Sequence, residues 1–367
     1  MIVPFNDLNR IHKPIMDDSL KVFKKIIDNN QFVLNEYIKN FETEFATFTN
    51  QKNCISCSNG TDAIELILRG LDIGPGDEVL LPTNSFIATS EAVSRAGATP
   101  VFIDNDEYYL INCSGIEKYL TKKTKAIIAV NLYGQMCNLK ELSSISKKNG
   151  VHLIEDAAQS HGAKDSNGKP VGYYSTAAAY SFYPGKNLGA WGDGGGVTTN
   201  SNELAKKMEA LRDHGSEKKY YHKYKGFNSR LQPFQGYVLS RKLSSLEEWN
   251  EERNNIAFQY NDALSSNARI ITPQIYNNNK HVWHLYLLRV KSRKKFMHQA
   301  AEQGVETSIH YPVPIHRQKA YSDHKQSKVN FKNADSFSKN LVSLPIFPKM
   351  KKSEIYKVID VVSKITL

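Results

Sequence analysis

The feature that most limits how this chain can fold is an alternation of short apolar segments with helical patterns in its first half. The helical patterns cover residues 61–71, 85–96 and 139–148, and the apolar segments are 78–81, 100–103, 125–130, 151–155 and 177–182. Such alternation is typical of β-α repeats, whose strands pair in parallel. No Gly-x-Gly-x-x-Gly follows the first strand, which argues against a dinucleotide-binding fold. The sequence therefore predicts an α/β fold with a mostly parallel sheet.

Two helical segments are expected before this region, at residues 6–29 and 36–49. Aromatic residues recur at helical spacing in the second of them, namely Tyr37, Phe41, Phe45 and Phe48. We interpret this stripe as part of the core, because it lies along one face of a helix.

A change of pattern near residue 245 marks the predicted domain boundary. A long polar helix is expected at 246–264, followed by a strand-like segment at 281–290. The chain has 367 residues, of which 40% are hydrophobic, and this is enough to form two cores. We therefore expect a large domain over residues 1–245 and a smaller α+β domain over residues 246–367.

The net charge of +11 is of a kind found in many nucleic-acid-binding proteins. The lysines, however, occur as scattered pairs, such as 122–123 and 218–219, rather than as one basic stripe. We expect no nucleic-acid partner. A general positive field can instead steer a small anionic substrate toward a cleft.

The cysteines and the apolar segments bear on the cellular compartment in which the protein is expected. The four cysteines (Cys54, Cys57, Cys113 and Cys137) do not make a disulfide framework. Cys54 and Cys57 lie three apart on an expected strand and point to opposite faces, which suits neither a shared metal nor a disulfide. No segment is long enough to span a bilayer, and the first residues lack a secretion signal. We expect a cytoplasmic protein without a metal ion or membrane insertion.

Lys186 is the first candidate for chemistry. It follows the apolar segment 177–182 and lies in a turn-forming run that extends to Gly196. A half-buried lysine shifts its pKa readily and is suited to forming a Schiff base, whereas an exposed lysine is only solvated charge. The local context leaves both interpretations open.

Two further segments follow predicted strands, where ligands bind in open α/β sheets. Residues 58–62 form a glycine turn that opens a helix, and the free N–H groups there suit a phosphate, unless the turn is a plain helix cap. Asp156 ends a buried strand, with Gln159 and His161 after it. Its carboxylate either caps the next loop or needs a partner, such as the protonated ring nitrogen of a cofactor.

Six segments together resemble the sugar aminotransferases of the DegT/DnrJ/EryC1/StrS family, in order from about Pro4 to the C-terminus. They are residues 58–63, 155–162, 181–189, 192–195, 228–231 and 309–312. The resemblance implies a pyridoxal phosphate (PLP) enzyme of fold type I with an aspartate-aminotransferase-like fold. It also implies a homodimer with shared active sites.

The resemblance implies a role for each matching residue. Lys186 is similar to the lysine that forms a Schiff base with the cofactor and then moves a proton, and Asp156 to the partner of the pyridinium nitrogen. Phe86 is similar to the ring that stacks on the cofactor, and Gln159 to the contact of its phenolic oxygen. The positions that match phosphate ligands are Gly60, Thr61, Ser181 and, from the neighbouring subunit, Asn228. The candidates for substrate binding are Tyr183, Tyr221, Arg230, His310, Tyr311 and His316.

The reaction that the resemblance implies is transfer of an amino group from L-glutamate to a nucleotide-linked keto sugar, as in deoxyamino sugar and glycan biosynthesis. Residues 4–8, 58–62 and 86–97 are most similar to members that aminate C3 of a dTDP-linked 3-keto-6-deoxyhexose. Amination at C4 of a dTDP- or UDP-linked 4-keto sugar is the alternative. A remote alternative is a non-catalytic regulatory or nucleic-acid-binding homologue. A related dehydratase branch has histidine in place of the lysine, and Lys186 argues against it.

The chain departs from the family pattern at two places. Gln232 and Pro233 follow residues 228–231, where the family usually continues with aspartate. The lost carboxylate puts a subunit or phosphate contact in question, although proline is tolerated in the first turn of a helix. Gly185 stands where threonine is frequent.

Overall fold

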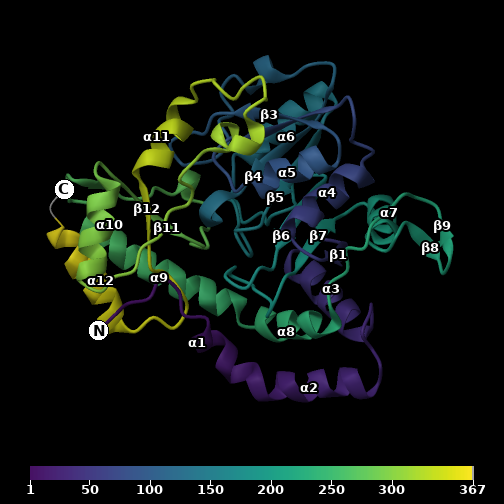
Figure 1. The fold of residues 1–367 in the computed structure, drawn as a ribbon, viewed down its shortest axis with the longest axis horizontal. Coiled ribbons are helices and arrows are strands. Elements are labelled where there is room, and N and C mark those ends of the chain that lie inside the picture. The colour runs from purple at the N-terminus through teal and green to yellow at the C-terminus, as the bar shows by residue number, and fades with distance from the viewer. Residues whose placement is uncertain (366–367) are drawn as a thin grey trace.

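The computed structural model describes residues 1–365, and Figure 1 shows the central sheet within them. The strand order is β1-β7-β6-β5-β4-β2-β3. Strands β2 to β6 pair in parallel, whereas β7 is antiparallel to both β6 and β1. The bounds are β1 Asn53–Cys57, β2 Glu78–Pro82, β3 Thr99–Ile103, β4 Thr124–Val130, β5 His152–Asp156, β6 Ala177–Ser181 and β7 Gly195–Thr199. The mostly parallel sheet predicted from the alternation is therefore confirmed.

Strand β7 was not predicted, because its first residues belong to the glycine-rich run that reads as a turn. A Cβ atom at Gly195 would collide with the carbonyl oxygen of Asn59, and one at Gly196 would lie 3.1 Å from the Phe182 ring. These glycines are therefore needed for close packing inside the sheet rather than for a turn.

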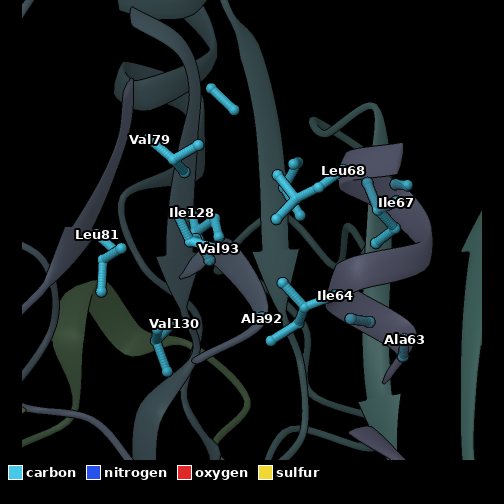
Figure 2. Close-up of a cluster of buried hydrophobic side chains, with 14 of the residues drawn as sticks. Ala63, Ile64, Ile67, Leu68, Val79, Leu81, Ala92, Val93, Ile128 and Val130 are labelled. Atoms are coloured by element: carbon cyan, nitrogen blue, oxygen red, sulfur yellow. The ribbon is translucent and has the colours of Figure 1, made fainter. Parts of the chain in front are cut away.

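Helices cover both faces of this sheet. Figure 2 shows one face, where α4 (Gly60–Gly70) and α5 (Ala88–Arg95) pack their apolar side chains against the strands. On the other face lies α3 (Glu36–Phe48), whose Phe45 ring meets the rings of Tyr180 and Phe182 at 4.9 and 5.3 Å. Within the predicted aromatic stripe, Phe41 and Phe45 are core and Phe48 packs against them, whereas Tyr37 is only half-buried.

The two faces also separate the cysteines of the central sheet. Cys57 packs in the core under α4, Cys54 packs in the core under α3, and both are buried free thiols. The prediction that these side chains point to opposite faces is confirmed.

The chain after residue 245 forms a second, antiparallel sheet in the order β10 (Ile270–Ile271), β11 (Tyr286–Val290) and β12 (Leu341–Leu344). Its helix α9 (Leu246–Leu264) contributes to a core with Trp283 and Tyr286. Later residues return to the first sheet: the Gln326 side chain exchanges hydrogen bonds of 2.8 and 2.9 Å with the backbone of Phe102 in β3. Because this part contacts both sheets, the boundary at residue 245 stays a prediction.

The N-terminal helical segment is interrupted near Pro14, which lacks an N–H donor. It forms α1 (Asn9–His12), a 3-10 turn η1 (Lys13–Ile15) and α2 (Met16–Asp28). Helix α2 lies beside α8 (Pro233–Leu243), as Figure 1 shows, and α8 begins at the proline that departs from the family pattern. The helix expected after that proline therefore forms.

The remaining elements complete the two parts. In Figure 1 the hairpin of β8 and β9 extends away from the main body beside α7. Among residues 1–365, none of the helices combines the length and the hydrophobicity that a membrane-spanning segment requires. The bounds are α6 Leu139–Asn149, α7 Asn202–Arg212, α10 Arg293–Glu302, α11 Lys332–Asn340, α12 Lys352–Lys364, β8 Ser216–Lys218, β9 Tyr221–His222, β10 Ile270–Ile271, β11 Tyr286–Val290 and β12 Leu341–Leu344. Short 3-10 turns are η2 Ile116–Tyr119, η3 Leu132–Gly134, η4 Tyr276–Asn278, η5 Ile315–Arg317 and η6 Lys319–Tyr321.

Candidate active site

A cavity of about 790 Å³ lies at the carboxyl ends of the parallel strands. It is lined from three parts of the chain: the N-terminal segment at Phe5 to Leu8, the loops of the first sheet, and residues after 245. Ten of the predicted site residues line it, namely Gly60, Thr61, Phe86, Asp156, Gln159, Ser181, Tyr183, Lys186, His310 and Tyr311. The expectation that strand ends converge on one site agrees with this cavity.

Lys186 lies in the loop after β6, and its N–H donates to the carbonyl of Tyr183 (2.8 Å). The adjacent Asn187 is buried, and its Nδ2 donates to Asn250 Oδ1 and to the carbonyl of Val282, both at 2.8 Å. Burial lowers the pKa of the Lys186 ammonium group to about 8, although the nearby Asp156 carboxylate opposes this. The amine has no hydrogen-bond partner within residues 1–365, so the loop is held firmly while the amine is free to react.

Asp156 ends β5 with its carboxylate buried in the cavity wall. Oδ2 accepts a hydrogen bond from Thr89 Oγ1 (2.8 Å), and Oδ1 accepts one from the N–H of Ala158 (3.2 Å). Burial raises the pKa of this carboxyl group, while the two hydrogen bonds and the charge of Lys186 lower it. No cation lies within ion-pair distance in the described chain, so the site has room for one positive partner.

The start of α4 forms a cradle for an anion. Asn59 caps the helix by accepting a hydrogen bond from the N–H of Asp62 (2.9 Å), which leaves the first N–H groups, at Gly60 and Thr61, without intrahelical acceptors. Ser181, at the end of β6, lies so close that a Cβ atom at Gly60 would be 2.7 Å from its Cβ. Glycine is required at this position because the helix start and the strand end nearly touch.

Gln159 connects the cavity to two tyrosines. Its Oε1 accepts from the N–H of Tyr133 (2.6 Å), and its Nε2 donates to Tyr311 Oη (3.1 Å). Tyr133 Oη in turn donates to the carbonyl of His310 (2.6 Å). Burial lowers the pKa of His310 to about 4 and raises that of Tyr311, so both side chains are neutral near pH 7.

Four of the predicted residues do not line the cavity of their own chain. Tyr221 lies on the hairpin and is 68% exposed, and Arg230 forms an ion pair with Asp213 (2.6 Å). Asn228 pairs with the same Asp213 through the backbone. All three belong to the segment between α7 and α8.

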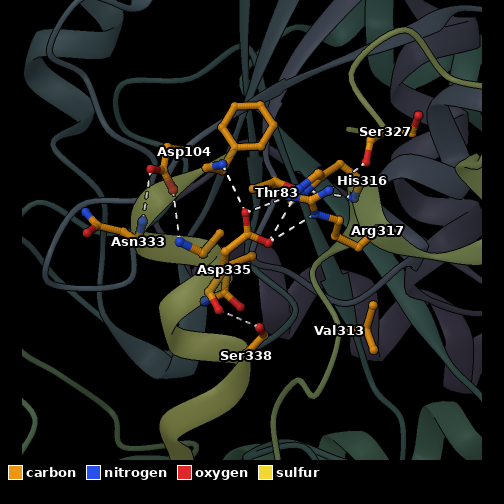
Figure 3. A network of polar contacts seen from close by, with 12 residues as sticks. Thr83, Asp104, Val313, His316, Arg317, Ser327, Asn333, Asp335 and Ser338 are labelled. Atoms are coloured by element: carbon orange, nitrogen blue, oxygen red, sulfur yellow. Dashed lines mark hydrogen bonds and ion pairs between the residues drawn. The ribbon is translucent and has the colours of Figure 1, made fainter. Parts of the chain in front are cut away.

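His316 is the fourth of these residues, and it is fully buried elsewhere. Figure 3 shows it in a polar network with Thr83 and Asp335, and its Nδ1 lies 2.6 Å from Thr83 Oγ1. It connects the C-terminal part to the strand end at Thr83 rather than pointing into the cavity.

Several cavity residues were missed by the sequence analysis. Thr89 had a usable signal, because it follows Ser85 by four residues in the helix expected at 85–96. In the structure α5 begins only at Ala88, but the two hydroxyl oxygens still lie 2.9 Å apart. Arg253 and His284 had none, because only the folding of the C-terminal part brings them to the cavity. The same holds for Phe5, whose ring stacks on His310 with centroids 5.8 Å apart.

Comparison with known proteins identifies one family and relatives that match almost the whole chain. The sequence profile of the DegT/DnrJ/EryC1/StrS aminotransferase family matches residues 14–363. A relative from Aneurinibacillus thermoaerophilus, named dTDP-3-amino-3,6-dideoxy-alpha-D-galactopyranose transaminase, is 43% identical over 364 residues, with 99% of each chain covered. Another, from Geobacillus stearothermophilus and named pleiotropic regulatory protein, is 39% identical over 367 residues and covers 99% of this chain and 98% of its own.

A solved structure is similar over the same length. The crystal structure of S. venezuelae DesV in complex with ketimine intermediate has a TM-score of 0.96 and 37% identity. The match covers 99% of this chain and 98% of that chain. The predicted fold class is therefore confirmed.

Proposed function

Because this chain belongs to the DegT/DnrJ/EryC1/StrS aminotransferase family and is a PLP-dependent enzyme, we propose that it aminates C3 of a dTDP-linked 3-keto-6-deoxyhexose, with L-glutamate as the donor. The observation that carries the proposal is the position of Lys186 in the cavity near Asp156, with its pKa lowered to about 8. The name of the Aneurinibacillus relative, a dTDP-3-amino sugar transaminase, supports the 3-keto substrate.

The residues of the cavity fit the cofactor. Within residues 1–365 the buried Asp156 carboxylate has no cationic partner at ion-pair distance, and a protonated ring nitrogen would provide one. The cradle at Gly60, Thr61 and Ser181 would hold the phosphate group, and Phe86, 54% exposed, offers an aromatic face. When bound, PLP supplies an electron-accepting ring that stabilises negative charge on the carbon beside the amino group.

Side chains of the protein would hold the cofactor and move the proton. Lys186 would hold the cofactor through its amine and, once the amino group of the donor has displaced it, would move the proton at the reacting carbon. A pKa of about 8 suits this task near neutral pH, because both protonation states of the amine are then accessible. Gln159 donates one of its two amide N–H groups to Tyr311 and would donate the other to the phenolic oxygen of the cofactor.

The working unit in this proposal is a homodimer in which the segment between α7 and α8 serves the neighbouring site. Asn228 lies outside the cavity of its own chain, and the hairpin that carries Tyr221 extends away from the main body (Figure 1). An extended hairpin beside Asn228 can reach a second chain. The compartment we propose is the cytoplasm, which the free thiols at all four cysteines support.

The donor half of the proposal is tested by absorbance spectroscopy. The purified protein loaded with PLP should show the visible band of the lysine-bound cofactor, and L-glutamate should bleach it. Lys186→Ala should lack the band and should not turn over. A spectrum that L-glutamate leaves unchanged, with the cofactor bound, would contradict glutamate as the donor.

The acceptor half is tested by product analysis. The enzyme, L-glutamate and either a 3-keto or a 4-keto dTDP-6-deoxyhexose are incubated, and the amino sugar is identified by mass spectrometry and NMR. We expect a 3-amino product, and an enzyme that aminates only the 4-keto dTDP or UDP sugar would favour the alternative. No amination of either sugar, with glutamate still bleaching the band, would exclude both.

A further inference from the structure

Arg253 is a buried cation in the cavity wall that the proposed chemistry leaves without a task. It lies on α9, is 3% exposed and lines the cavity. Its Nη1 donates to the backbone carbonyls of Ile346 (2.6 Å) and Trp283 (3.2 Å), while its buried Nε has no hydrogen-bond partner in the described part of the chain. Within residues 1–365 no carboxylate lies within ion-pair distance of it. A single guanidinium nitrogen, Nη1, therefore connects the segments that carry Trp283 and Ile346. The positive charge of Arg253 has no carboxylate to balance it in the described chain.

A second buried arginine shows what a purely structural one looks like in this protein. Arg212 is also buried, but it forms an ion pair with Glu42, which raises its pKa. Burial instead lowers the pKa of Arg253 to about 10, so it remains charged near neutral pH. An unpaired buried charge costs free energy, and the cost is offset when a ligand supplies the opposite charge.

Arg253 lies close to the reacting lysine. Asn250, three residues earlier on α9, accepts a hydrogen bond from Asn187, the neighbour of Lys186. The charges of Lys186 and Arg253 both contribute to lowering the pKa of His284, so this histidine is within electrostatic reach of both cations. One turn of α9 thus packs against the loop that carries the lysine.

His284 is held as one tautomer between them. Asn187 uses its Nδ2 as a donor twice, so its Oδ1 is the acceptor and His284 Nδ1, 3.0 Å away, is the donor. Its Nε2 is then an uncharged acceptor, which offers no attraction to an anion. The cationic side chains that line the cavity in the described chain are Lys186 and Arg253.

We propose that Arg253 binds a carboxylate group of the amino donor. The inference rests on the proposed transaminase function: Lys186 is committed to the cofactor, and an amino-acid donor needs a fixed cation beside the reacting amine. Nη1 of Arg253 is used on two carbonyls, which leaves Nη2 to donate a charge-assisted hydrogen bond to a carboxylate. The diphosphate of the sugar nucleotide is a weaker candidate, because it is attached to a ring carbon other than the one that reacts.

The two half-reactions separate these possibilities, because both need the cofactor and Lys186 but only one involves a carboxylate. The first is bleaching of the visible band by L-glutamate. The second is the reverse reaction, in which the 3-amino dTDP-sugar product converts the same PLP-loaded enzyme. For Arg253→Gln we expect kcat/KM of the glutamate half-reaction to fall at least ~100-fold, as for loss of a buried charged partner. The amino-sugar half-reaction should stay within about threefold, because it makes no contact with the lost charge.

A binding measurement complements the kinetics. Glutarate, which carries the carboxylates but no amino group, is titrated by calorimetry into the PLP-loaded protein, in which Lys186 and the phosphate cradle are occupied by the cofactor. Wild type should bind it, Arg253→Gln should lose this binding, and Arg253→Lys should retain part of it, because lysine keeps the charge without the planar fork.

Tyr260→Phe is the matched control. Tyr260 lies on the same helix and donates to the carbonyl of Pro345 (2.9 Å), next to the carbonyl that Arg253 holds, but it does not line the cavity. Both half-reactions should stay within about twofold of wild type, which shows that loosening this loop is not enough.

The possible outcomes are distinct. Equal losses in both half-reactions for Arg253→Gln, or unchanged glutarate binding, would overturn the inference and assign Arg253 a structural role. A loss confined to the amino-sugar half-reaction would assign it to the diphosphate. If wild type ignores L-glutamate but glutarate binding still depends on Arg253, the donor in the proposed function is wrong and the carboxylate site stands.

Discussion

At the scale of single residues, the chemistry depends on the Lys186 amine, whose pKa the protein lowers toward neutral pH. Lys186 sits in a loop fixed by the hydrogen bonds of Asn187, in a cavity whose burial lowers its pKa from 10.5 to about 8. This reactivity has a thermodynamic cost, because the folded cofactor-free protein binds the lysine proton less tightly than the unfolded chain does.

The first prediction concerns that cost. Below pH 8 the amine is charged in both states and the penalty is complete; between pH 8 and 10.5 it fades, because the folded protein loses the proton first. Cofactor-free Lys186→Met should therefore be more stable than wild type at pH 7, by at most about 3 kcal/mol, and the two should converge toward pH 10.5. Urea denaturation at several pH values measures this.

The control for this experiment is Lys140→Met, which changes an exposed lysine on α6 and should show no such convergence. A Lys186→Met variant that is less stable than wild type at pH 7, or a difference that grows with pH, would contradict the prediction.

At the scale of elements, the phosphate cradle depends on how closely α4 approaches the sheet. The helix start at Gly60 lies against Ser181 of β6, and Gly195 of β7 lies against the backbone of Asn59. The close contact brings the free N–H groups of α4 and the Ser181 hydroxyl to one place, so the cradle is a property of three elements packed without intervening side chains.

The second prediction is that Gly60→Ala weakens the cradle. The new Cβ atom would lie 2.7 Å from Ser181 Cβ, so α4 or β6 must move. We expect PLP affinity to fall about tenfold or more and stability to fall by about 1–3 kcal/mol, as for overpacking in a dense core. Absorbance titration with PLP and urea denaturation are the measurements.

Gly185→Ala is the matched control in the neighbouring loop. Its Cβ atom would meet only the ring of Tyr183, at 3.6 Å, which is an ordinary contact. Its PLP affinity should stay within about twofold of wild type. Equal affinities for Gly60→Ala and wild type would show that the cradle tolerates displacement.

At the scale of the whole molecule, the site is assembled from parts far apart in sequence. The stacking of Phe5 on His310 joins the N-terminal segment to the C-terminal part, and Gln159 connects the first sheet to Tyr311. In the proposed homodimer the segment that carries Asn228 adds the last part from the neighbouring chain.

The third prediction tests that sharing by subunit complementation. Lys186→Ala homodimers should be inactive and Asn228→Ala homodimers impaired. If each site uses Lys186 of one chain and Asn228 of the other, a mixed dimer carries both changes in one site and neither in the other. Equal mixing after reversible dissociation should then recover about a quarter of wild-type turnover, because half of the dimers are mixed and each has one intact site.

Steady-state assays before and after mixing, with size-exclusion chromatography to verify exchange of subunits, provide the measurement. A mixture whose turnover is only the average of the two parent homodimers would mean that each chain builds its own site.

The features that depend on local pattern could be predicted from the residues alone. The alternation of apolar and helical segments predicted the parallel sheet. Because parallel strands end at the same edge, Asp156 at the end of β5 and Lys186 in the loop after β6 line one cavity. The other features depend on packing between distant parts of the chain. Such packing makes a strand of the glycine run at Gly195, where backbones touch, and it brings Arg253 and Phe5 to the cavity from parts of the chain that no periodicity connects.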